Sequence, residues 1–191
     1  MIKYARIVLQ DCKHAIEKHS ISLQSEEFRI SWITITTLLR SIGHVLQNKD
    51  SQISPLHNKV INEKWDELNK TKPVPEIFWE FIVKERNRFL KEYEHGISRV
   101  GHIGIINPDG KGEISLSFDM ANARGGTIEI GKTRIKSIIS SGKYKNQSEK
   151  EVAWMAYDWW EKYLDDIDTL IKIYSDKDKK TVSTRISKQL L

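Results

Sequence analysis

The apolar positions of residues 28–46 recur at alternating steps of four and three, which is the strongest periodic signal in the chain. Because an α-helix has about 3.6 residues per turn, this spacing places the apolar side chains on one stripe. Ser25 is suited to begin this helix, because Glu26 and Glu27 follow where the helix dipole favours acidic groups. The stripe is typical of the seam of an antiparallel bundle and consists of Phe28, Trp32, Ile35, Leu39, Ile42 and Leu46.

The same period predicts four further helices. They cover residues 2–19, 56–69, 75–94 and 148–174. Pro75 suits the first turn of its helix, where a missing N–H costs nothing, and Ser148 with Glu151 forms a capping box at the start of the last helix. The adjacent Trp159 and Trp160 both fall on the broad apolar stripe of that last helix. This position favours core packing or a dimer interface over stacking on bases.

Residues 96–142 have a different character, because they hold nine of the ten glycines. Turn signals at 108–110 and 125–126 separate short β-branched runs. We expect strands at 114–118 and 127–130 and a short helix at 134–140. The predicted fold class is therefore mainly α: an antiparallel bundle of about five helices with a small β-hairpin or irregular insertion before the last long helix.

One domain is expected over residues 1–174, because 191 residues suffice for a single core without disulfides or metals. Residues 175–191 form a basic tail. Cys12 is the only cysteine, which excludes an intramolecular disulfide and a zinc site of clustered thiolates and favours a reducing compartment. Neither a signal peptide nor an apolar run of about 20 residues is evident. We therefore expect a cytoplasmic protein that does not enter a membrane.

The formal net charge of +5 favours approach to polyanions. Since 31 basic residues are interleaved with 26 acidic ones, a nucleic-acid surface has to be a local patch. The plainer interpretation, that the charge only keeps the protein soluble, stays open.

Arg88 and His95 are the candidate catalytic residues. Seven residues apart, they lie on nearly the same helix face, about 10 Å from each other along the axis. Arginine offers a planar fork for phosphate, and histidine titrates near neutrality. A histidine that assists attack of the ribose 2′-OH, with an arginine that stabilises the phosphoryl charge, can cleave RNA without metal or cofactor. As the structural alternative, Arg88 pairs with Glu92 and His95 caps the helix before Gly96.

Further candidates for RNA binding lie on two helices. Glu85 and Arg86 fall at the buried margin of the helix at 75–94, an expensive place for charge unless each is paired or faces a polar cleft. Arg86 and Asn87, together with Arg40 and His44 on the helix that begins at Ser25, line one basic groove if the two helices are neighbours. Arg29 shares the face of Arg40. The alternatives are a buried network of Glu85 with Arg86 and a solvated face on the other helix.

The chain resembles the HEPN superfamily of small α-helical bundles, which occur in toxin–antitoxin, phage-defence and RNA-processing systems. The resemblance rests on the helical order and on Arg88-x6-His95, which is similar to the Arg-x4–6-His motif of that family. The segments 85–87 and 159–164 are also similar to uncharacterised bacterial HEPN-like proteins. The chain departs from the motif in that Phe89 follows Arg88, where active members usually carry a polar residue.

The resemblance implies a homodimer whose motifs meet across a symmetric cleft, with RNA as the substrate and without metal. The hypothesis is a HEPN-like RNA-binding protein or metal-independent endoribonuclease that acts as a toxin or phage-defence component. The alternative is a non-catalytic interaction module, such as an antitoxin, an immunity protein or a phage-encoded inhibitor. Such a module would hold a protein partner through residues 96–142 or the tryptophan-bearing helix.

Overall fold

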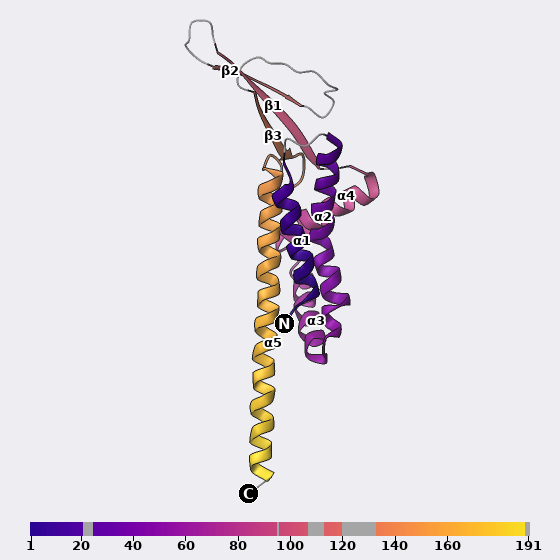
Figure 1. Cartoon of the computed structure of the whole chain (residues 1–191), viewed down its shortest axis with the longest axis vertical. Helices are drawn as coiled ribbons and strands as arrows, with labels where there is room; N and C mark the ends of the chain where they lie inside the picture. The colour runs from indigo at the N-terminus through magenta and orange to yellow at the C-terminus, as the bar shows by residue number, and fades with distance from the viewer. Residues whose placement is uncertain (21–24, 95, 107–112, 120–132, 190–191) are drawn as a thin grey trace.

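In the computed structural model, an elongated helical bundle carries a small sheet at one end (Figure 1). The structure describes residues 1–20, 25–94, 96–106, 113–119 and 133–189. The helices are α1 (Tyr4–Lys18), α2 (Ser25–Asn48), a 3₁₀ turn (Asp50–Gln52), α3 (Pro55–Lys70), a π-helical segment (Ile77–Val83), α4 (Lys84–Glu92) and α5 (Glu149–Gln189). The strands are β1 (Ile97–Ile106), β2 (Glu113–Asp119) and β3 (Thr133–Ile139). The mainly α fold class with an insertion before the last helix is confirmed.

The predicted seam of α2 forms the centre of the core. All six of its apolar residues are buried, and they pack with α1, α5 and the π-helical segment. The largest fully buried side chains are Trp32, Trp160, Phe78 and Phe81. Trp159, half-buried, lies 5.1 Å from the Phe78 ring between centroids. The tryptophan pair therefore serves core packing, as its position on the stripe indicated.

The sheet has the strand order β2-β1-β3, and both pairings are antiparallel. The strand predicted at 114–118 is confirmed within β2, whereas the one predicted at 127–130 lies outside the described residues. The short helix predicted at 134–140 is wrong, because β3 covers this segment and pairs with β1 from Ile97↔Ile139 to Ile103↔Thr133. Its β-branched isoleucines suit a strand, and the decisive partner, β1, was not predicted.

The predicted helix at 75–94 is divided into two parts. Residues 77–83 form a π-helix, and α4 then continues to Glu92 and ends at Tyr93, which adopts the left-handed conformation with φ 54° and ψ 28°. The last helix continues beyond the predicted end at residue 174, so that α5 extends past the bundle on the side away from the sheet (Figure 1). Among the described helices, none is long and apolar enough to cross a membrane.

Candidate functional site

Helices α2 and α4 are neighbours in the bundle. The N-terminal part of α2 meets the C-terminal end of α4, where the Arg29 guanidinium lies 5.9 Å from the centre of the Tyr93 ring. Further along, Arg40 of α2 lies close enough to Arg86 of α4 for the two charges to affect each other. The basic groove predicted from the sequence required these two helices to be neighbours, and in the structure they are.

Arg40, His44 and Arg86 form a basic cluster between these helices. Burial lowers the pKa of Arg40, and the charge of Arg86 lowers it further. Burial also lowers the pKa of His44, with added repulsion from Arg40 and then Arg86. Within the described part of the chain, no carboxylate forms an ion pair with any of the three. The cluster is thus a local excess of positive charge.

The Arg40 guanidinium has only part of its bonding capacity in use. It lies 5.8 Å from the centre of the Phe78 ring, while its buried Nη1 has no hydrogen-bond partner. Arg86 donates from Nη1 to the side-chain oxygen of Asn87 at 3.2 Å. A buried N–H without an acceptor costs free energy, and an anion seated on the cluster would supply the missing negative charge. The arrangement is suited to bind a phosphate or a similar oxyanion.

Arg88, a predicted catalytic residue, is held by a carboxylate. Its Nη1 lies 3.1 Å from Oε1 of Glu85, which is 5% exposed. Burial raises the pKa of Glu85, while the Arg88 charge and the Gly96 N–H, which donates to this carboxylate, oppose that rise. Arg88 therefore forms an ion pair within its own helix, as the structural alternative predicted, but its partner is Glu85 and not Glu92. His95, its predicted catalytic partner, lies outside the described residues.

Gly96 fits closely over this ion pair. A Cβ atom at this position would lie 2.0 Å from Nη1 of Arg88 and 2.6 Å from both carboxylate oxygens of Glu85. A Cβ here would therefore displace the Arg88 guanidinium or the Glu85 carboxylate. The Glu85–Arg88 pair thus holds the chain where it leaves α4 and enters β1, which is a structural role for Arg88.

A second polar cluster, to which the sequence assigned no chemistry, lies where the sheet meets the bundle. The buried His19 contacts Ser31 Oγ through Nδ1 at 2.9 Å, and its Nε2 lies 3.5 Å from Oε1 of the buried Glu149. Ser137 of β3 donates to the same carboxylate oxygen at 2.5 Å. His19 directly follows α1, and the other three residues come from α2, β3 and α5, so that no spacing in the sequence could predict their contact.

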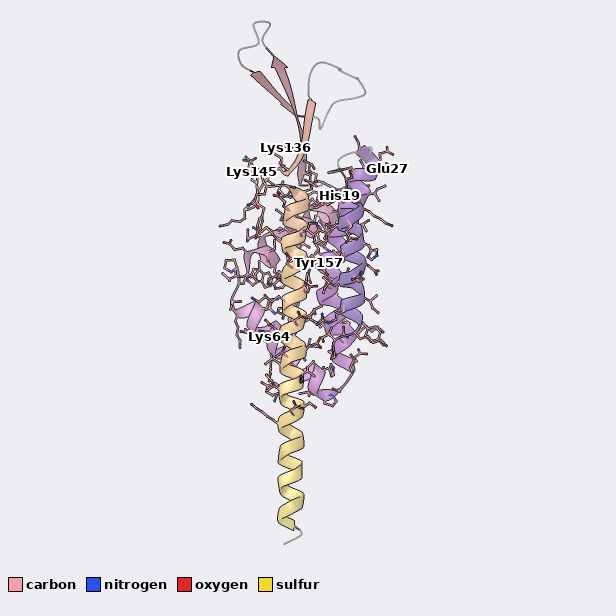
Figure 2. All side chains as sticks on the ribbon, turned by 60° about the vertical axis from the view of Figure 1, so that its left-hand side comes forward. His19, Glu27, Lys64, Lys136, Lys145 and Tyr157 are labelled. Carbon is pink, nitrogen blue, oxygen red and sulfur yellow. The ribbon has the colours of Figure 1, made fainter. Side chains whose placement is uncertain are left out.

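This junction borders a pocket of about 750 Å³ that His19, Ser137 and Glu149 help to line. Figure 2 shows His19 at the end of the bundle that β3 reaches, with Lys136 above it. Both His19 and Glu149 are buried, and Nε2 of His19 and Oε2 of Glu149 have no hydrogen-bond partner. We interpret the network as the polar anchor of the sheet on the bundle.

The described residues contain no group of three or more His, Cys, Asp or Glu side chains placed to hold a metal ion. No protein-family model matches the chain, and neither a curated protein nor a solved structure matches it. The basic cluster of Arg40, His44 and Arg86 is the feature of the described residues that points to a ligand.

Proposed function

We propose that the protein binds RNA through the basic cluster of Arg40, His44 and Arg86. The observation that carries the proposal is the convergence of two guanidinium groups and one imidazole from two helices without a carboxylate partner among the described residues. Positive charges that folding leaves unbalanced are typical of sites that an anionic ligand neutralises.

RNA is the polyanion that the other observations favour. The chain carries a net charge of +5, and the resemblance to HEPN proteins implies RNA as the target. Arginine is the residue that best matches the geometry of a phosphate, because its planar fork donates two parallel hydrogen bonds. The neighbouring His44 and Asn87 can contact the ribose or the next phosphate.

The proposal is tested by fluorescence anisotropy with a labelled mixed-sequence RNA at low salt. We expect the Arg40→Gln/Arg86→Gln variant to bind about a hundredfold more weakly, because each charge-assisted hydrogen bond contributes roughly 1.5–3 kcal/mol and each 1.4 kcal/mol is about tenfold in affinity. The matched control is Lys145→Gln/Lys172→Gln, which removes the same charge from two exposed lysines outside α2 and α4. Equal weakening in both double variants would show that binding follows net charge, not the cluster.

RNA cleavage is a second candidate, and a specific observation favours it. Burial and the charges of Arg40 and Arg86 lower the pKa of His44, which favours the neutral imidazole that can accept a proton beside two guanidinium groups. The Arg88 and His95 pair stays a prediction for the same chemistry. Incubation with RNA in EDTA separates the two histidines: loss of 2′,3′-cyclic phosphate products in His44→Ala but not in His95→Ala assigns the base to the cluster. The reverse pattern assigns it to His95.

A toxin or phage-defence role and a homodimer belong to the same proposal, and sedimentation equilibrium of the full chain tests the dimer. The alternative is a non-catalytic module that holds a protein partner through residues 96–142 or α5. Absence of RNA binding by the wild-type protein would favour that alternative.

A further inference from the structure

The basic cluster is one end of a longer surface between α2 and α4, and Tyr93 lies at the other end. Arg29 and Arg40 are eleven residues apart on α2, which is about 16 Å along its axis on nearly the same face. Arg86 lies on α4, and Tyr93, seven residues later, directly follows the last residue of this helix, about 10 Å away along the axis. Since the Arg29–Tyr93 contact and the Arg40–Arg86 pair both join α2 to the segment of α4 and its C-cap, they mark two ends of one track.

Tyr93 is placed in an unusual way for an aromatic residue. Its side chain is 66% exposed, and its backbone adopts the left-handed conformation (φ 54°, ψ 28°) that closes α4. Helices usually close in this way on glycine or asparagine, since a bulky side chain is strained there. Strain of this kind is concentrated at functional sites, where it has a use that folding does not explain.

The neighbours of Tyr93 hold its ring and leave much of it open. Phe89 lies one turn earlier, with the ring centres 5.2 Å apart, and the Arg29 guanidinium lies 5.9 Å from the Tyr93 ring centre. Nε of Arg29 is buried and has no hydrogen-bond partner. An exposed aromatic ring braced by a second ring and an arginine is the arrangement that stacks an unpaired base, with the cation available to the phosphate.

We propose that Tyr93 is a stacking platform for a base of single-stranded RNA, whose phosphates follow the track from Arg29 to Arg40 and Arg86. This inference rests on the proposed RNA-binding function and adds the class of substrate. A duplex keeps its bases stacked inside and offers none to Tyr93. The exposed Glu92 and Glu94 flank Tyr93 in sequence and repel phosphates, so the strand backbone runs on the Arg29 side.

The test compares wild-type protein with Tyr93→Asn and Tyr93→Phe. Asparagine tolerates the left-handed conformation but has no ring, so the thermal midpoint is expected to be unchanged or higher. The probes are a labelled 12-nucleotide single-stranded RNA of mixed sequence and the duplex of the same length. We expect Tyr93→Asn to bind the single strand about tenfold more weakly, Tyr93→Phe to bind like wild type, and the duplex affinity to be the same for all three.

The outcomes separate this inference from the proposed function. If Tyr93→Asn binds the single strand like wild type while Arg40→Gln/Arg86→Gln does not, the platform is wrong and the RNA site stands. An equal loss of affinity for the single strand and the duplex in Tyr93→Asn also overturns the platform, because the ring would then affect the binding of phosphates and not the stacking of an unpaired base. If wild-type protein binds neither probe, both proposals fail.

Discussion

Arg6 and Arg40 are two arginines on neighbouring helices with opposite surroundings. Arg6 of α1 donates to Asp168 at 2.6 Å and to Asp165 at 2.7 Å, both on α5. Although burial alone would lower the pKa of Arg6, the two carboxylates raise it. Arg40 of α2 faces Arg86, and both burial and that charge lower its pKa.

The difference shows which charges the fold itself explains. The ion pairs of Arg6 hold α1 against α5, and Asp168 also accepts the N–H of Ile2 at 2.6 Å. The charge of Arg6 therefore has a role in the stability of the fold. The charges of Arg40 and Arg86 work against the folded state, because like charges are brought together partly away from water. A ligand of opposite charge is the natural reason to keep them there.

The largest effect on stability is expected at Arg88, whose charge, like that of Arg6, is balanced by a carboxylate. Arg88→Met leaves the buried Glu85 without its counter-charge, and we expect a loss of about 3 kcal/mol in the free energy of unfolding by urea at pH 7. The pKa of Glu85 is already raised by burial and rises further in the variant. Since the native variant then binds a proton that the unfolded chain releases, the deficit shrinks as the pH falls from 7 toward 5.

The matched control for this variant is Glu85→Gln/Arg88→Met, which removes the buried charge together with its partner. It should recover much of the lost stability, because no uncompensated carboxylate remains. If Arg88→Met unfolds at the same urea concentration as wild type, the ion pair contributes nothing and Arg88 is free to serve the phosphate chemistry predicted from the sequence.

A smaller effect on stability is expected when Arg6 and Arg40 are each replaced by glutamine and the two variants are compared. Arg6→Gln should lower the free energy of unfolding by about 1–2 kcal/mol, discounted because Asp165 is 61% exposed. Arg40→Gln should leave it unchanged within about 0.5 kcal/mol or raise it, since a like-charge contact is removed. RNA affinity should fall in Arg40→Gln and stay close to that of wild type in Arg6→Gln. A larger loss of stability in Arg40→Gln than in Arg6→Gln would contradict the division into balanced and unbalanced charges.

The sequence predicted the helices well because their information is local. The spacing of Phe28 to Leu46 alone defines the buried side of α2, and Ser148 marks the start of α5, where its Oγ accepts the N–H of Glu151 at 3.4 Å. The strand β3 was mistaken for a helix because its conformation depends on pairing with β1, whose paired residues lie 30 to 42 positions earlier in the chain. Local patterns do not contain such long-range pairings.

The same distinction applies to the site. The residue types and faces of Arg40, His44 and Arg86 were readable from helical spacing, whereas their meeting depended on the packing of α2 against α4. The sequence also placed Glu85 where charge is expensive, but whether Arg86, Arg88 or a cleft would satisfy it was a matter of tertiary structure. In the structure Glu85 forms an ion pair with Arg88.

The smallest predicted effect, a pH dependence, tests whether the unbalanced cluster is completed by phosphate. Burial, Arg40 and Arg86 lower the pKa of His44 from its ordinary value near 6.5 in the free protein. A bound phosphate offsets the two guanidinium charges and so raises this pKa, which means that binding takes up a proton. RNA affinity should therefore rise as the pH falls from 7.5 to 5.5, by about threefold and always by less than tenfold per pH unit.

The stability of the free protein changes in the opposite direction over this range, because it falls as the pH falls. Because the folded pKa of His44 lies below the unfolded one, its contribution to stability is present above pH 6.5 and is lost as the pH falls through the folded pKa. His44→Gln should flatten the pH dependence of RNA affinity, whereas His14→Gln, which alters an exposed histidine on α1, should leave it as in wild type. An unchanged slope in His44→Gln would mean that phosphate does not reach the imidazole, and the cluster would then bind RNA through its two arginines alone.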